Sequence, residues 1–281
     1  MKKIIVSYII PAYNTESTIE NCITQIQKQK FNKEIIVVDD GSKDKTKKIA
    51  EKLGAKVITI PNSGASIARN LGIELSTGDY IALIDSDSYL NRNWTEKMVK
   101  NYSRNIDFII TFPDLDKKNY ELIVKRFESD PKVTLDNIVA FGNGVFFSKN
   151  KKEIVKYNEN FLVGGEDWEI IINLLKKKSR IIANTKAKFK HKHQFSSQKK
   201  RILTFIKKKF LFSYGDMYCF LKHRDVKSIN GFFRQNLWIT PFFPLIYSYI
   251  KLKKIINQEK IENIKKEFIK KGDLHEKRIF V

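Results

Sequence analysis

The first 90 residues alternate short apolar runs with stretches of helical periodicity. The runs contain few polar residues, which is typical of parallel strands buried on both faces. Between the first two runs, Ile19, Ile23 and Ile26 are spaced by four and three, as on one face of an amphipathic helix. This alternation predicts βαβ units around a mainly parallel sheet. We expect strands at 4–10, 34–38, 56–60 and 80–84, and helices at 16–30 and 42–53.

Polar residues gather directly after each expected strand. Ligands of open α/β sheets bind at the carboxyl ends of the strands, so we expect the functional site at this edge. The sequence has neither the GxxxxGK[ST] nor the GxGxxG pattern, so bound phosphates would have to be neutralised in another way. The polar clusters are Tyr13-Asn14, Asp39-Asp40-Gly41-Ser42, Asn62-Ser63-Gly64 and Asp85-Ser86-Asp87.

One of these clusters is an Asp-x-Asp pair, formed by Asp85 and Asp87. Carboxylate oxygens suit Mg²⁺ or Mn²⁺, which can bridge a diphosphate. Taken alone, the pair is weak evidence for a metal site and fits a solvated turn better, because Asp and Ser favour turns.

Composition adds a basic second half to this picture. The 281 residues carry a net charge of +22, and 42% of them are hydrophobic, enough for a packed core. Residues 176–281 hold 28 of the 53 Lys and Arg residues but only 7 of the 31 acidic ones. The sequence has only two cysteines, which we expect to be free thiols rather than part of a disulfide framework. The N-terminal residues do not have the pattern of a signal peptide. We therefore expect a cytoplasmic protein.

Four segments together resemble glycosyltransferase family 2. The resemblance covers residues 4–197 and implies the GT-A fold, an α/β domain with a Rossmann-like mixed, mainly parallel sheet flanked by helices. It places a catalytic domain at residues 1–198 and implies metal-dependent, inverting transfer from a nucleotide-diphospho-sugar. The segments are Val6–Asn14, Ile35–Thr46, Gly64–Ile73 and Gly78–Asp87.

By this resemblance Tyr13 stacks on the donor base and Asp40 accepts a hydrogen bond from a base ring nitrogen, which favours uracil. Arg69 would pair with the donor diphosphate or with the Asp-x-Asp carboxylates. A core aromatic and a surface salt bridge remain the alternatives for Tyr13 and Arg69, and Asp39 is expected to hold the turn that follows it. The donor nucleotide set is Pro11, Tyr13, Asn14, Asp40, Arg69, Asp85 and Ser86.

The resemblance also implies a metal site for Mn²⁺ or Mg²⁺. Asp87 would ligate the ion directly, and Asp85 would contact the ribose and a metal-bound water. His191 and His193 alternate on one side of an expected strand. We expect His193 to be the contact, by its spacing to Ser196, and a solvated polar histidine is the alternative.

Glu166 and Asp167 follow a glycine pair and precede a helical pattern, so both fall in the first turn of a helix. Acids there complement the helix dipole. In the resembling family the Asp of such a pair is the catalytic base, which assigns that role to Asp167. Residues 141–147 would line the donor sugar, with a hairpin turn as the alternative. The set for donor sugar and acceptor is Gly142, Asn143, Glu166 and Trp168.

We expect residues 199–281 to form a basic, aromatic-rich helical extension. It would either bind peripherally to a membrane or mediate oligomerisation. Their longest uncharged run, 235–250, has 16 residues and contains two prolines. As a helix it would reach about 24 Å, short of a hydrocarbon core of about 30 Å. We expect attachment to the anionic inner face of the cell membrane, with a core or homodimer helix pair as the alternative.

These features predict single-sugar transfer, with a UDP-sugar favoured, to a hydroxyl of a lipid-linked or cell-surface glycan. The Q-x-x-R-W motif of processive family members is incomplete at 234–238, which lacks the arginine before Trp238. Two other functions stay open: nucleic-acid binding by the basic aromatic extension, and nucleotide-sugar binding without catalysis. We do not expect nucleic acid, because carboxylates at the strand ends repel phosphate unless a metal intervenes.

Overall fold

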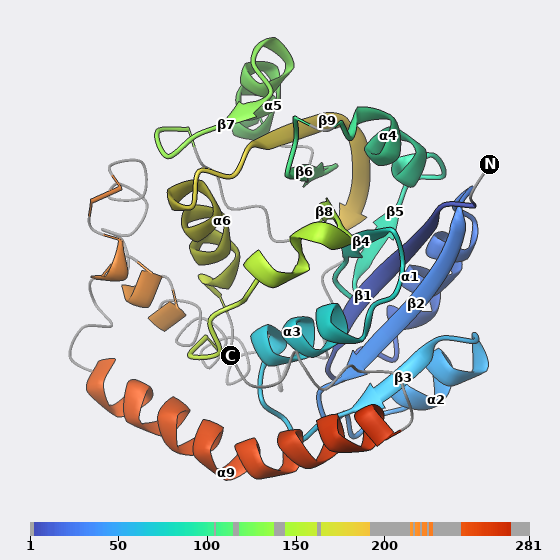
Figure 1. Cartoon of the computed structure of the whole chain (residues 1–281), viewed down its shortest axis with the longest axis vertical. Coiled ribbons are helices and arrows are strands. Elements are labelled where there is room, and N and C mark those ends of the chain that lie inside the picture. The colour runs from blue at the N-terminus through green and yellow to red at the C-terminus, as the bar shows by residue number, and fades with distance from the viewer. Residues whose placement is uncertain are drawn as a thin grey trace.

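A nine-stranded mixed sheet runs through the described part of the chain and carries helices on both faces (Figure 1). Its strand order is β3-β2-β1-β4-β8-β6-β9-β5, and β7 pairs with β9. The computed structural model describes residues 3–103, 105–114, 118–137, 144–161, 164–191, 214–215, 217–219, 221–223, 225–226 and 243–270.

The first four strands form the parallel half of the sheet, as the apolar runs predict. They are β1 (Ile5–Ala12), β2 (Asn32–Asp39), β3 (Lys56–Thr59) and β4 (Tyr80–Leu83). Neighbouring residues of β1 face opposite sides of the sheet, since Tyr8 packs in one core cluster and Ile9 in the other. Both residues are fully buried, which explains the unbroken apolar pattern.

The second half of the sheet is mixed. Strand β8 runs antiparallel to β4 and to β6, whereas β6 and β9 are parallel. Strands β5 and β7 pair antiparallel with β9. The mixed, mainly parallel sheet is therefore confirmed. The bounds are β5 (Ser88–Leu90), β6 (Phe108–Pro113), β7 (Lys132–Val133), β8 (Val145–Ser148) and β9 (Ile181–His191).

Helices cover the two faces of the sheet with apolar stripes. Ile19, Ile23 and Ile26 of α1 pack on one face with Trp94 of α4, and Leu71 of α3 packs on the other face. The first two helices are shorter than expected, because residues 16–18 form a turn before α1 and residues 43–45 form a bend before α2. The bounds are α1 (Ile19–Gln27), α2 (Thr46–Lys52), α3 (Ala65–Leu75), α4 (Trp94–Asn101), α5 (Lys118–Ser129), η1 (Lys149–Ile154) and α6 (Glu166–Lys176).

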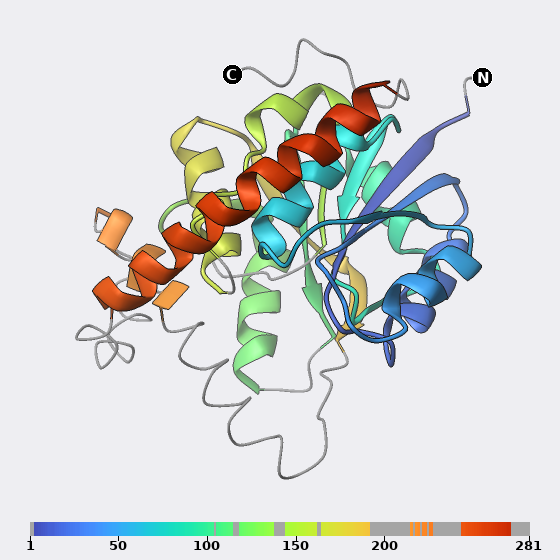
Figure 2. The same ribbon diagram turned by 90° about the horizontal axis from the view of Figure 1, so that it is seen from below.

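A long helix from the C-terminal region, α9 (Phe243–Lys270), crosses the face of the domain that carries α3 (Figure 2). Ile261 is 7% exposed and joins the core on this face, and Lys265 Nζ lies 3.3 Å from Glu74 Oε2 on α3. Among the described helices, α9 included, none has the length and apolarity needed to cross a membrane.

Candidate active site

The carboxyl ends of β1, β2 and β4 lie side by side, because the three strands are parallel neighbours. Pro11 is buried in β1, and Tyr13 follows the strand with 45% of its surface exposed. Asp39 ends β2 and Asp40 comes next, whereas Asp85 lies two residues beyond β4. The structure thus brings these predicted residues to one edge of the sheet.

Asp40 is held by the turn that precedes α3. Its Oδ1 accepts a hydrogen bond from the Ser63 N–H at 2.6 Å, and its Oδ2 accepts one from the Gly64 N–H at 2.9 Å. Asn62 Nδ2 donates to the Asp40 backbone oxygen at 3.2 Å. Burial raises the pKa of Asp40 to about 6, although the two N–H donors favour the ionised form. Carboxylate oxygens offer about four acceptor sites, so Asp40 can still accept a bond from a ligand.

Asn14 and Asp39 shape the loop beside Tyr13. The Asn14 N–H donates to Ser42 Oγ at 2.9 Å, and its Oδ1 accepts from the Lys43 N–H at 2.8 Å. Asp39 Oδ1 accepts from the Ser42 N–H at 3.2 Å, so the structural role expected of Asp39 is observed. These bonds join the ends of β1 and β2. A direct contact of Asn14 with the nucleotide stays a prediction.

Arg69 lies on α3 and is only 4% exposed. One guanidinium nitrogen lies 2.9 Å from Asp85 Oδ1, and another lies 3.2 Å from Glu166 Oε1. Its guanidinium carbon is 5.2 Å from the centre of the Tyr157 ring. Arg69 therefore pairs with the Asp-x-Asp carboxylate, one of its two expected partners, and its burial excludes the surface salt bridge. Burial raises the pKa of Asp85, and the charge of Arg69 opposes this effect.

Asp85, Asp87 and His191 each bring one ligand atom into a cluster in which all three atoms lie within 4.8 Å of one another. His191 Nε2 is 2.8 Å from Asp87 Oδ1. Strand β9 ends at His191. This residue pairs with Ser88, which directly follows Asp87 in the sequence. His193, the expected ligand, lies outside the described residues. The histidine that the structure places at the carboxylates is thus His191.

This cluster fits a divalent cation by its chemistry. Carboxylates suit Mn²⁺ and Mg²⁺, and the imidazole favours Mn²⁺, because Mg²⁺ takes oxygen ligands almost exclusively. The surrounding charges are also compatible with a cation, since four carboxyl groups interact with only one guanidinium and one imidazole. These groups are Asp85, Asp87, Glu166, Asp167, Arg69 and His191.

Asp167 lies in the first turn of α6, as expected. Desolvation raises the pKa of Asp167 well above its usual range; Arg69 opposes this, whereas Glu166 and Asp85 add to it. Gly165 precedes the helix with φ of +79°, and a Cβ there would lie 2.4 Å from the Gly215 oxygen. A larger residue would therefore disturb the entry to α6.

The remaining predicted residues are either buried or not described. Trp168 is 7% exposed and belongs to the hydrophobic core, and Ser86 is 6% exposed. Gly142 and Asn143 lie outside the described residues. Two contacts were not predicted: the hydrogen bonds by which the expected polar cluster at 62–64 holds Asp40, and the Tyr157 ring beside Arg69. Only the first had a signal, a polar cluster directly after a strand.

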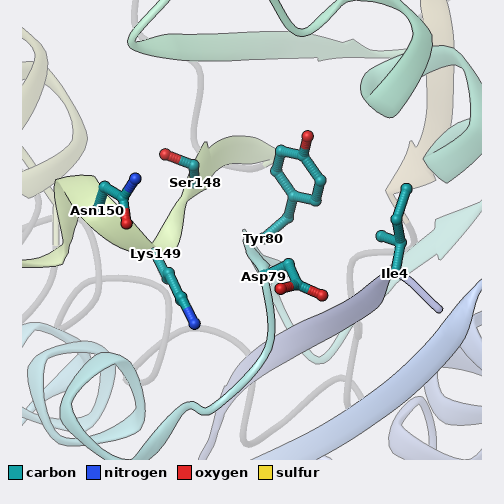
Figure 3. A pocket seen from close by; sticks show the side chains of 6 residues that line it. All are labelled: Ile4, Asp79, Tyr80, Ser148, Lys149 and Asn150. Atoms are coloured by element: carbon teal, nitrogen blue, oxygen red, sulfur yellow. The ribbon is translucent and has the colours of Figure 1, made fainter. Parts of the chain in front are cut away.

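A cavity of about 330 Å³ lies away from this site (Figure 3). It adjoins Tyr80, the first residue of β4, and therefore lies at the end of the sheet opposite the carboxylates. None of its lining residues belongs to the predicted site, and we assign it no part in donor binding. It is lined by Ile4, Asp79, Tyr80, Ser148, Lys149 and Asn150.

Comparison with known proteins places this site in a family context. A family described as Glycosyl transferase family 2 matches residues 7–215. EpsH of Bacillus subtilis is 34% identical over 157 residues, which are 52% of this chain and 46% of EpsH. WfgD of Escherichia coli, named UDP-Glc:alpha-D-GlcNAc-diphosphoundecaprenol beta-1,3-glucosyltransferase, is 32% identical over 145 residues, 50% of this chain and 56% of WfgD. The chain spans about half the length of these curated relatives.

The fold also has solved counterparts. The mannosyltransferase PcManGT from Pyrobaculum calidifontis, solved with GDP-Man and Mn²⁺, superposes with a TM-score of 0.63 at 14% identity. The superposition covers 91% of this chain and 76% of PcManGT. At this identity the likeness concerns the fold alone, and it confirms the expected GT-A type architecture.

Proposed function

The chain belongs to glycosyl transferase family 2, and on that premise we propose that it is a metal-dependent, inverting glycosyltransferase. It moves a single sugar from a nucleotide-diphospho-sugar to a hydroxyl of a lipid-linked or cell-surface glycan. The observation that carries this proposal is the cluster of Asp85, Asp87 and His191 at the strand ends, with Arg69 bonded to Asp85. It is the only group of three or more such ligands among the described residues.

We assign the donor base to Tyr13 and Asp40 at the ends of β1 and β2. The exposed Tyr13 ring offers a stacking face, and Asp40 offers an acceptor for a ring N–H. This pairing favours a UDP-sugar. WfgD is named for UDP-Glc, whereas PcManGT was solved with GDP-Man, so relatives and fold neighbours differ in the base.

Asp87 and His191 would hold the cation, Mn²⁺ in preference to Mg²⁺, with Asp85 kept in place by Arg69. When bound, the cation neutralises charge on the leaving diphosphate. Asp167 removes the proton from the acceptor hydroxyl, whose oxygen attacks the anomeric carbon as the bond to the diphosphate breaks. A single displacement of this kind inverts the anomeric configuration. Desolvation makes the ionised carboxylate of Asp167 a stronger base, and the charge of Arg69 favours that ionised form.

A screen of UDP-, GDP- and TDP-sugars with Mn²⁺ tests this proposal, following nucleotide release with and without lipid-linked and free glycan acceptors. We expect release from a UDP-sugar that rises when the right acceptor is present. Nucleotide-sugar binding without release under any condition would indicate a non-catalytic binding protein. Retardation of RNA in a gel-shift assay without nucleotide release would favour the nucleic-acid alternative. Either outcome contradicts the proposal.

We also propose that the protein binds peripherally to the inner face of the cell membrane. The outer face of α9 would contact the lipid. Leu245, Tyr249, Leu252 and Ile256 are 72%, 56%, 57% and 59% exposed, and their spacing of four, three and four places them in one stripe. Residues 243–257 contain no acidic residue, and Lys251 is exposed. An anionic lipid surface complements this charge, whereas a second copy of the stripe would bring like charges together.

The double variant Leu252→Asp, Ile256→Asp tests the stripe. It should reduce co-sedimentation with vesicles of phosphatidylglycerol and phosphatidylcholine by about tenfold or more, because two inserted apolar side chains are lost. Asn263→Asp is the matched control, since it adds a charge at an exposed position further along α9. Unchanged binding by the double variant would contradict the proposal, and so would dimer formation without any vesicle binding by the unaltered protein.

A further inference from the structure

Helix α9 reaches back to the turn that holds Asp40, almost 200 positions earlier in the chain. Asn257 is 8% exposed, and its Nδ2 donates to the Asn62 backbone oxygen at 3.1 Å and to Ser63 Oγ at 3.2 Å. Lys253 Nζ donates to Asn62 Oδ1. Lys253 and Asn257 are one turn apart, so both lie on the side of α9 that faces the domain.

The atoms that α9 contacts belong to the same turn as the donors to Asp40. The Ser63 and Gly64 N–H groups bond the two carboxylate oxygens, and Asn62 Nδ2 bonds the Asp40 backbone oxygen. The hydrogen bonds therefore form a continuous path from α9 through residues 62–64 to Asp40. A shift of this turn would change the orientation of the Asp40 carboxylate, because the N–H pair fixes that orientation.

The position of α9 is fixed by contacts further along the helix. Ile261 is buried in the core beneath it, and Lys265 bonds Glu74 of α3. Lys253 and Asn257 thus lie in a part of α9 whose position is fixed by packing, not at a frayed helix end. Asn257 is also the one buried polar residue among the described side chains of α9, and burial of an amide is favourable only when its hydrogen bonds are made.

We propose that Asn257 and Lys253 are positioning residues for the donor base: by fixing the turn at 62–64 they aim Asp40, so that α9 completes the nucleotide end of the donor site. The inference rests on the proposed function and extends it to the C-terminal region of the chain. It predicts that α9 affects recognition of the base and leaves the diphosphate end of the site unchanged.

The test compares Asn257→Ala and Lys253→Met with Glu259→Ala, an exposed control on the same helix. We measure the Kd of UDP and the inhibition constant of pyrophosphate, both with Mn²⁺, together with KM and kcat for the best UDP-sugar. Asn257→Ala and Lys253→Met should each weaken UDP binding and raise KM by about fivefold to twentyfold. This is the effect expected from the loss of one or two hydrogen bonds. Pyrophosphate inhibition and kcat should stay within about twofold, and Lys253→Arg should restore UDP binding.

Three results would overturn the inference, and they separate it from the proposed function. Unchanged UDP affinity in both variants, with weakened affinity in Asp40→Ala, would refute the role of α9 and leave the donor site intact. Equal weakening of UDP and pyrophosphate would show a general structural effect. Absence of UDP binding by the unaltered protein, with binding of another nucleotide or none, would refute the UDP assignment and the inference together.

Discussion

Arg69 organises the candidate site at the scale of single residues. Its guanidinium is buried, and it bonds one carboxylate from the end of β4 and one from the start of α6. Removing one partner of a buried ion pair leaves a charge without compensation, which costs about 3–5 kcal/mol. We therefore read Arg69 as the group that allows Asp85 and Glu166 to stay close together before a cation binds.

Asp167 carries the proposed proton transfer, so Asp167→Asn should reduce kcat by about a hundredfold to ten-thousandfold. The amide has a similar shape but cannot accept the proton, and the Kd of the UDP-sugar should stay within about twofold. Steady-state kinetics and calorimetric binding on the same preparation measure both quantities. Parallel loss of binding and turnover would instead assign Asp167 a structural role.

Asp40 predicts a pH dependence of donor binding. Its pKa is about 6 because it is buried; the Ser63 and Gly64 N–H groups and the charge of Lys253 lower the pKa, and Asp39 raises it. A base N–H binds the ionised carboxylate, so affinity for a UDP-sugar should fall about tenfold per pH unit below 6 and level off above it. Titration calorimetry from about pH 4.5 to about 7.5 measures the affinity for the UDP-sugar at each pH. Asp40→Asn should remove the dependence, and an unchanged profile in that variant would contradict the assignment.

Much of the site follows from sequence at this scale, and its limits have physical causes. Asp39, Asp40 and Asp85 could be placed because each lies at or just beyond the end of a buried apolar strand. His191 could not be separated from His193, because alternate residues of a strand share one side. The pairing of β5 with β9 brings His191 to Asp87, and this register is a tertiary property that spacing does not contain.

At the scale of elements, the approach of α3 to β1 fixes the position of Arg69. Gly72 faces β1 so closely that a Cβ would lie 2.2 Å from Ile9 Cγ2. Because Ile9 is fully buried, it has no free space to move into. The close contact therefore requires glycine at this position.

Gly72→Ala should lower the free energy of unfolding by about 1–3 kcal/mol, because overpacking outweighs the gain in helix propensity. Urea unfolding measures the change. Lys48→Ala, at an exposed position of α2, is the control and should stay within about 0.5 kcal/mol. An equal or higher stability of Gly72→Ala would show that α3 can move away from β1.

The elements themselves were unevenly predictable. Strands β1 to β4 were predicted because they form apolar runs in a regular βαβ order. Strand β7 has two residues and β5 has three, and both pair with the distant β9. Such short strands carry no usable periodicity, so their place depends on pairing across the chain.

At the scale of the whole molecule, α9 links the basic C-terminal region to the domain built on the sheet. Its inner face holds the turn at 62–64, and its outer face exposes the apolar stripe. The net charge of +22 indicated an anionic partner, but it gave no indication of the inner contact. Asn257 and Asn62 are far apart in sequence, and a single asparagine in a polar helix carries no signal of such a contact.

The most direct test of the central claim is the affinity of the best UDP-sugar by titration calorimetry, with Mn²⁺ and with a chelator. Asp87→Ala is compared with Asp136→Ala, an exposed carboxylate that belongs to no part of the predicted site. We predict that Mn²⁺ tightens binding by about tenfold or more in the unaltered protein and in Asp136→Ala, and that this gain is lost in Asp87→Ala. Binding of the same strength with chelator, or a full Mn²⁺ effect in Asp87→Ala, would contradict the account.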